Sequence, residues 1–301
     1  MPWLELRIDA SEHQAAGLEL ALTNAGALAV TYADAGDQPI LEPEAGTMPL
    51  WSEIQMVALF DASTDTTGTE TDIQSKVASD IQQYRWNILE DRVWEREWLK
   101  HQQPIKFGDS FWVYHERIDS EEPTLLLDPG LAFGTGSHPT TALCLEWIAQ
   151  QSITGKSVID YGCGSGILAV AALLNGATQA DCVDIDPQAL DATLSNAERN
   201  QISSEKISVF FPGNEPAQSA DVLFANILAG PLKQLAPSLA GKISHGGYIC
   251  LSGILREQEP EILASYQLWF DNLETKVSGD WIRIVGQRNN QRATEKTWSK
   301  K

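Results

Sequence analysis

A short glycine-rich stretch at residues 158–166, VIDYGCGSG, has the residue types of a ligand-binding turn. An apolar run leads into Gly162 and Gly164, and a third glycine follows after one further residue. A turn that binds the pyrophosphate of a dinucleotide carries its third glycine one position later, where this chain has Ile167. Asp160, two residues before the turn, would repel a pyrophosphate and attract a cation. The spacing therefore disfavours a dinucleotide and predicts a turn that approaches a positively charged ligand.

A second acidic position, Asp184, lies 22 residues after Gly162, at the end of the apolar run in CVDIDP. An acid at such a strand end can accept hydrogen bonds from both hydroxyls of a ribose, which favours a ligand contact. A capping or turn role is the alternative for Asp184, but Asp186 stands directly before Pro187 and is the better N-cap candidate. A ligand with a ribose and a positive charge but no phosphate matches S-adenosylmethionine, which carries adenosine, an amino acid end and a sulfonium.

The elements that must hold these residues alternate between strand and helix patterns from residue 157 onward. The pattern predicts strands at 157–161, 180–186, 207–211, 221–227 and 246–253, helices at 166–177, 187–200, 231–242 and 256–266, and a closing hairpin at 273–287. Such alternation predicts an α/β fold with a doubly wound, mostly parallel sheet. Because ligands bind outside the C-terminal ends of such strands, we expect Asp160, Asp184 and Asn226 to share one site.

The first hundred residues predict a separate, smaller α+β domain. Strand patterns at 3–9, 27–33, 51–61 and 91–100 and helix patterns at 11–26 and 71–85 follow the order β-α-β-β-α-β. This order is typical of a ferredoxin-like module. The polar runs at 33–49 and 61–72 are expected to be surface loops. We predict one domain over 1–103 and a second over 104–301, which begins with a linker at about 104–122.

The pattern Asp-x-Gly-x-Gly-x-Gly, with an acid at the end of the next strand, resembles that of the class I methyltransferases over about residues 123–288. Asn226 ends the fourth strand, where many amine methyltransferases carry Asn-Pro-Pro-aromatic and accept hydrogen bonds from the amino group with the amide oxygen and the next carbonyl. Here Ile227 and Leu228 follow, so the aromatic ring on which a planar base or a glutamine would stack is missing. A flexible aliphatic amine does not need that ring. A structural turn role is the alternative for Asn226.

Further motifs carry a more specific resemblance. The stretches WEREWLKHQQPIKFGD, LDPGLAFGTGSHPTT, IDYGCGSGIL, DIDPQA and ANILAGPL occur in this order and resemble the bacterial ribosomal protein L11 methyltransferase family over nearly the whole chain. The resemblance implies transfer of methyl groups from S-adenosylmethionine to lysine side chains and the N-terminal amine of a basic ribosomal protein. It also implies that the N-terminal domain holds this substrate.

The resemblance assigns Thr141, Gly162, Asp184 and Asn226 to cofactor-contact positions, with Asn226 as the catalytic residue. Gly164 and Asp160 join them on the physical grounds given above. FGTGSHPTT is expected to fold over the amino acid end of the cofactor. Phe133 is expected either to cover the cofactor or to belong to the core. His138 beside a proline is expected to be structural rather than a base.

Composition limits the partners. The formal net charge of −20 disfavours a nucleic-acid-binding surface and is compatible with a basic protein partner or with solubility alone. The four cysteines form no C-x-x-C pair, so no metal site is predicted, and the expected location is a reducing cytoplasm. No segment has the pattern of a secretory signal or of a membrane span. Nothing indicates oligomerisation, so a monomer is expected.

Two other classes of function remain open from the sequence. One is a methyltransferase that acts on RNA or on a small molecule. The other is a non-catalytic, cofactor-binding ribosome assembly factor.

Overall fold

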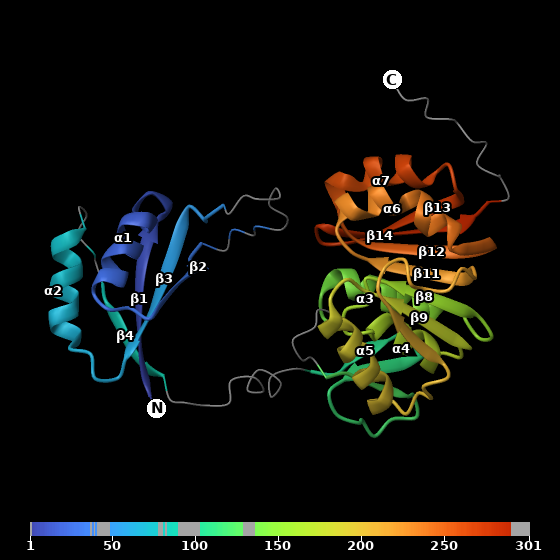
Figure 1. Ribbon diagram of the computed structural model, residues 1–301, viewed down its shortest axis with the longest axis horizontal. Helices are drawn as coiled ribbons and strands as arrows, with labels where there is room; N and C mark the ends of the chain where they lie inside the picture. Colours follow the sequence, from blue (N-terminus) through green and yellow to red (C-terminus); the bar gives the residue numbers. More distant parts are fainter. Residues whose placement is uncertain are drawn as a thin grey trace. The chain divides into compact units, whose positions relative to one another are not determined.

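The computed structural model describes residues 2–36, 38, 40, 49–77, 81, 83–89, 103–128 and 136–289. The chain divides into two compact units, Met1–Trp98 and Leu99–Lys301 (Figure 1). Residues 90–102 lie outside the described residues, so the domain boundary at 103 and 104 stays a prediction. No helix in the described part of the chain has the length and apolarity that a membrane span requires.

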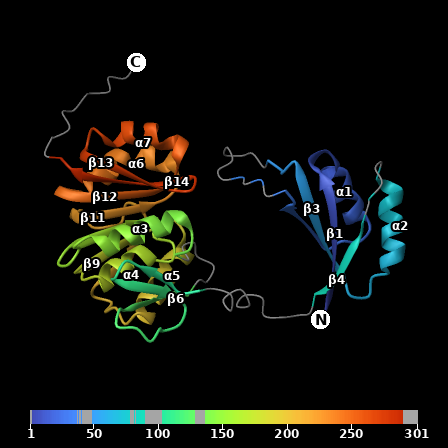
Figure 2. The ribbon, with the colours of Figure 1, turned by 180° about the vertical axis from the view of Figure 1, so that it is seen from behind.

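The N-terminal unit has the predicted order β-α-β-β-α-β. Its elements are β1 (Trp3–Ser11), α1 (Glu12–Asn24), β2 (Ala29–Asp34), β3 (Glu53–Asp61), α2 (Thr66–Lys76) and β4 (Arg85–Leu89). The strands form an antiparallel sheet in the order β2-β3-β1-β4, which confirms the ferredoxin-like arrangement. Leu22 of α1 and Ile73 of α2 belong to one buried cluster with sheet residues such as Ile8 and Met56, and both helices cover one face of the sheet (Figure 2).

Two predicted elements of this unit were wrong. The polar run at 61–72, expected to be a loop, contains the first half of α2. Burial of Thr69 and Ile73 against the sheet outweighs the weak helix propensity of its threonines and Gly68. The helix ends at Lys76 instead of continuing to residue 85, and the next residue, Val77, is extended (φ −103°, ψ 142°). The strand that completes the sheet is therefore β4, and the predicted strand at 91–100 lies outside the described residues.

The second unit begins with a small three-stranded sheet, followed by the predicted doubly wound sheet. The elements are β5 (Ile105–Phe107), β6 (Phe111–Tyr114), β7 (Thr124–Leu126), α3 (Pro139–Gln150), β8 (Ser157–Tyr161), α4 (Ile167–Leu174), β9 (Gln179–Val183), α5 (Pro187–Arg199), β10 (Ile207–Phe210), β11 (Ala220–Asn226), α6 (Ala229–Gly241), β12 (Ile243–Leu255), the 3₁₀ helix η2 (Arg256–Gln258), α7 (Glu259–Tyr266), β13 (Phe270–Ser278) and β14 (Trp281–Arg288). Residues 104–122, expected to be a linker, contain β5 and β6, because Phe107 and Phe111 stack on each other and belong to the core of this unit.

The large sheet has the strand order β10-β9-β8-β11-β12-β14-β13. The five strands from β10 to β12 are parallel, and β13 and β14 form the predicted antiparallel hairpin. After β8 the chain adds β9 and β10 on one side and then returns to place β11 on the other. The order therefore reverses between β8 and β11, and a ligand crevice is expected at the C-terminal ends of these two strands.

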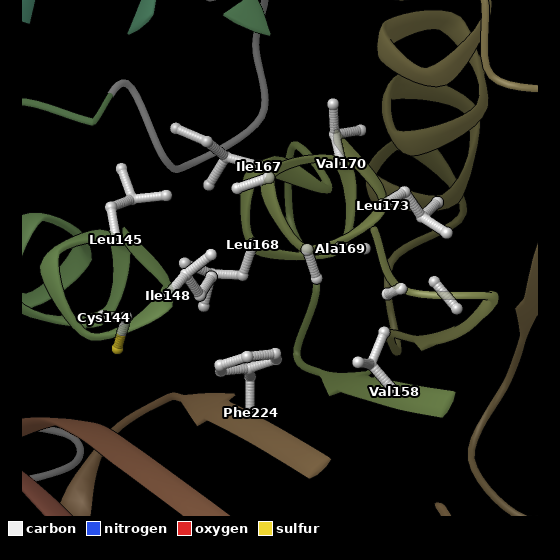
Figure 3. Close-up of a cluster of buried hydrophobic side chains, with 14 of the residues drawn as sticks. Cys144, Leu145, Ile148, Val158, Ile167, Leu168, Ala169, Val170, Leu173 and Phe224 are labelled. Atoms are coloured by element: carbon white, nitrogen blue, oxygen red, sulfur yellow. The ribbon is translucent and has the colours of Figure 1, made fainter. Parts of the chain in front are cut away.

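Helices cover both faces of this sheet. One face packs against α3, α4 and α5, and the other against α6 and α7. Figure 3 shows the first interface, where Phe224 and Val158 of the sheet meet Ile148 of α3 and Leu168 of α4. Residues of α4 are buried along its whole length up to Leu173, which explains its continuous apolar sequence. The switch point is thus built on rigid, fully packed elements.

Candidate functional site

A cavity of about 530 Å³ opens at the switch point. This volume lies within the range of small-molecule sites, roughly 300–1,000 Å³. All six residues that the sequence assigned to the site line the cavity: Thr141, Asp160, Gly162, Gly164, Asp184 and Asn226. They come from α3 and from the ends of β8, β9 and β11, so the fold joins segments that are up to 85 residues apart in the sequence.

The glycine turn after β8 has the backbone conformation that its glycines permit. Gly162, Gly164 and Gly166 have φ values of 78°, 53° and 75°, a region that other residues rarely adopt. The amides of Gly162 and Cys163 both donate to the carbonyl of Val183, at 2.7 and 3.1 Å, which holds the turn against β9. The turn therefore presents its backbone, free of side chains at alternate positions, to the cavity.

Asp160 is a buried carboxylate in the cavity wall, 1% exposed. Its Oδ2 accepts a hydrogen bond from the amide of Ala169 in the first turn of α4, at 3.1 Å. Its Oδ1 is buried and has no hydrogen-bond partner within the described part of the chain. Burial raises the pKa of Asp160 to about 7; the hydrogen bond from Ala169 opposes this rise, and the negative charge of Asp184 adds to it. A half-satisfied buried carboxylate is suited to a cationic ligand group.

Asp184 has a double role at the end of β9. Its Oδ2 accepts from the amide of Gly164 and its Oδ1 from the amide of Asp186, both at 3.0 Å. Asp186 caps α5 by accepting from the amide of Gln188, at 2.9 Å, which confirms the predicted cap. The sequence suggested that Asp184 is free for a ligand. In the structure it also ties the glycine turn to β9. Each carboxylate oxygen carries two lone pairs, so capacity for ligand hydroxyls remains on both.

Asn226 and Thr141 form a pair across the cavity wall. Asn226 Nδ2 donates to Thr141 Oγ1 at 3.2 Å, and Thr141 is buried in the first turn of α3. With Nδ2 on Thr141, Asn226 Oδ1 has no hydrogen-bond partner among the described residues and can act as an acceptor in the cavity wall. The pair therefore offers an oriented, uncharged acceptor to a group that carries hydrogens.

The region around the start of α3 is described in part. His138 is the N-cap of α3, where its Nδ1 accepts from the amide of Thr140, and its ring meets that of Trp281 edge-on at 5.2 Å. Burial lowers the pKa of His138. These contacts give it the structural role that the sequence favoured. Phe133 and the rest of residues 129–135 lie outside the described residues, as does the stretch at 94–102.

Sequence reasoning missed the apolar part of the wall. Ile185, Ile227 and Leu228 line the cavity, and the side chains of Ile185 and Leu228 remain 82% and 55% exposed. The signal was present in the sequence, because an apolar residue directly follows both Asp184 and Asn226. Exposed apolar side chains beside polar strand ends are typical of a binding site.

Residues 2–289 match the sequence model of the family described as ribosomal protein L11 methyltransferase (PrmA). A relative named ribosomal protein L11 methyltransferase from Pseudomonas putida (strain GB-1) is 48% identical over 291 residues, which cover 96% of this chain and 100% of the relative. A relative of the same name from Saccharophagus degradans is 48% identical over 289 residues, 95% of this chain and 99% of the relative. The crystal structure of a ribosomal protein L11 methylase from Lactobacillus delbrueckii subsp. bulgaricus aligns with a TM-score of 0.57 and 29% identity, over 62% of this chain and 100% of that one.

Proposed function

Because this chain belongs to the ribosomal protein L11 methyltransferase family, we propose that it methylates amino groups of ribosomal protein L11, at lysine side chains and at the N-terminal amine. The methyl donor is S-adenosylmethionine, in line with the class I methyltransferase fold of the second unit. The observation that supports amine methylation is the Asn226–Thr141 pair, which places a neutral acceptor in the wall of the cofactor cavity.

The residues of the cavity fit the parts of this cofactor. Asp184 can accept from the ribose hydroxyls while it holds the glycine turn. Asp160, whose buried Oδ1 has no hydrogen-bond partner among the described residues, suits the ammonium group at the amino acid end. The exposed apolar side chains of Ile185 and Leu228 offer surface against which apolar parts of the cofactor can pack. Bound here, the cofactor would supply a methyl carbon that is open to attack by an amine lone pair, with the neutral thioether as the leaving group.

The acceptor amine must be neutral, because an ammonium has no lone pair. A free lysine has a pKa of about 10.4. Because each pKa unit corresponds to about 1.36 kcal/mol, holding the lysine uncharged near pH 7 costs about 4 to 5 kcal/mol. A dry cavity and a nearby positive charge both lower this cost. Asn226 Oδ1 can accept a hydrogen bond from the neutral amine without stabilising the ammonium as a carboxylate would. Its role is to orient the lone pair toward the methyl group.

The N-terminal unit is proposed to bind the protein substrate. A methyltransferase for a small metabolite needs only a pocket, whereas this chain carries a separately folded unit with its own core. The net charge of −20 favours a basic protein over RNA. We further propose that the enzyme acts as a monomer in the cytoplasm; the four free cysteines, all buried, agree with a reducing compartment.

The test is incubation with methyl-labelled S-adenosylmethionine and three separate substrates: free ribosomal proteins including L11, intact ribosomes and bulk RNA. Label on the lysines and N-terminus of L11, located by mass spectrometry of its peptides, is the expected result. Label that enters only RNA would overturn the proposal in favour of an RNA methyltransferase. Tight cofactor binding with no label in any substrate would indicate a non-catalytic assembly factor.

A further inference from the structure

Ile227, the residue after Asn226, packs closely against Gly253 of the neighbouring strand β12. Gly253 lies in β12, next to Ser252, the register partner of Asn226. A β-carbon on Gly253 would lie 2.9 Å from the carbonyl carbon and 3.1 Å from the nitrogen of Ile227, and closer still to its carbonyl oxygen. Ordinary contacts of this kind are roughly 3.5–4.0 Å. The peptide of Ile227 therefore occupies the space that any other residue at 253 would fill.

The backbone of β12 is shaped to allow this approach. Its pairing with β14 shifts register between Leu251 and Ile254, so that Ser252 and Gly253 form a bulge. Gly253 has φ +79°, in the left-handed region that favours glycine. Bulges commonly re-aim the chain beside functional sites. Gly253 itself is not among the described residues that line the cavity, so any effect on the reaction must pass through Ile227.

The opposite side of Ile227 meets the glycine turn. A β-carbon on Gly162 would overlap Ile227 Cγ2 and lie 3.7 Å from its Cβ. The residue after Asn226 is thus held by its backbone against Gly253 and by its side chain against Gly162. These contacts come from β12 and from the turn after β8, and both strands flank β11.

We propose that Gly253 is a positioning residue for methyl transfer. It fixes the peptide of Ile227 and, through the chain, the direction in which Asn226 presents its amide oxygen to the acceptor amine. The proposal rests on the proposed amine methylation. It predicts that a methyl group added at Gly253 displaces the Ile227 peptide by about 1 Å, and misplacement on this scale can lower a rate by about 100-fold.

The experiment compares Gly253→Ala with Gly246→Ala. Gly246 lies in the same strand and has the same φ of +79°, but a β-carbon there would meet nothing within 4 Å. Both variants carry the same backbone strain, and only the first carries the clash. We expect Gly253→Ala to lower kcat on L11 by about 100-fold relative to Gly246→Ala, with Kd values for S-adenosylmethionine that agree within about threefold. Equal kcat values for the two variants, or a loss confined to cofactor affinity, would overturn the positioning role.

Thermal unfolding is recorded first for both variants. If Gly253→Ala does not fold, Ile227→Gly replaces it, because this change adds no atom and loosens the same peptide. A fall in kcat of about tenfold or more, larger than the fall in cofactor affinity, is then expected, and a kcat within about twofold of wild type would overturn the proposal. A wild-type enzyme that leaves L11 unlabelled would instead overturn the proposed function, and the positioning role with it.

Discussion

Asp160→Asn tests the electrostatics of the site most directly. The substitution keeps the shape of the side chain and removes its titration. In the wild type, burial raises the pKa of Asp160 from 3.8 to about 7. The folded chain therefore keeps a proton that the unfolded chain loses between about pH 4 and pH 7, and the free energy of unfolding falls as the pH rises through this window.

The magnitude follows from the size of the shift. At 1.36 kcal/mol per pKa unit, the contribution of Asp160 to the free energy of unfolding decreases by about 2 to 3 kcal/mol between pH 5 and pH 8. Asparagine does not titrate, so the variant lacks this decrease. The variant also has a fixed cost, because its amide meets a site where Oδ1 has no partner in the described residues. That cost is independent of pH and cancels when two pH values are compared.

The assay is urea unfolding of the cofactor-free protein at pH 5 and pH 8, for wild type, Asp160→Asn and the control Asp191→Asn. Asp191 lies on the exposed side of α5, so the control removes the same charge without the burial. We expect the stability of Asp160→Asn relative to wild type to be about 2 to 3 kcal/mol more favourable at pH 8 than at pH 5. The control should show no such change. A difference between Asp160→Asn and wild type that is equal at both pH values would refute a raised pKa.

Three other substitutions test the acceptor side of the site. Thr141→Val removes the partner of Asn226 Nδ2 in a buried position, so cofactor binding should weaken by about 1–3 kcal/mol in titration calorimetry while the circular dichroism spectrum stays unchanged. Asn226→Asp should lower kcat more than cofactor affinity, because a carboxylate stabilises the ammonium form of the acceptor amine. The exposed Asn214→Asp is its matched control. An equal loss of kcat and of cofactor affinity would contradict an orienting role. Gly162→Ala should weaken cofactor binding strongly. Adding Ile227→Ala should restore part of the binding, since it removes the Cγ2 atom that the new methyl group meets. If binding does not recover, the positive φ at residue 162 alone causes the loss of affinity.

The polar residues of the site could be predicted because strand ends in a doubly wound sheet converge. Asp160, Asp184 and Asn226 each follow an apolar run, and the topology brings the ends of β8, β9 and β11 to one edge. The sequence did not reveal that Asp184 also holds the turn through the amide of Gly164, because backbone donors have no residue type to recognise. Nor did it show the Thr141 contact of Asn226, which spans 85 residues.

The errors in the N-terminal unit have a common physical cause. The first half of α2 is rich in threonine and contains Gly68, so local propensity favours a loop. Its helix is stabilised by Ile73, which is fully buried against the sheet. In β4, the ring of Trp86 packs against Phe60 at 5.3 Å, a contact between residues 26 positions apart. In both cases tertiary packing decided the structure, and periodicity within one segment carried no information about it.

The replacement of the two prolines by Ile227 and Leu228 has a structural consequence that the motif comparison alone would misjudge. Prolines after the asparagine restrict the backbone by their rings, so their loss would be expected to free the loop. Here the restriction comes from outside the loop. Ile227 is packed between Gly162 and Gly253, 65 residues before it and 26 after it, and neither glycine has space for a β-carbon. A rigid acceptor loop is thus compatible with a sequence that lacks the prolines, provided that both glycines are retained. The exposed apolar side chain of Leu228, at the position of the second proline, adds an open apolar surface to the cavity wall, which suits the aliphatic stem of a lysine.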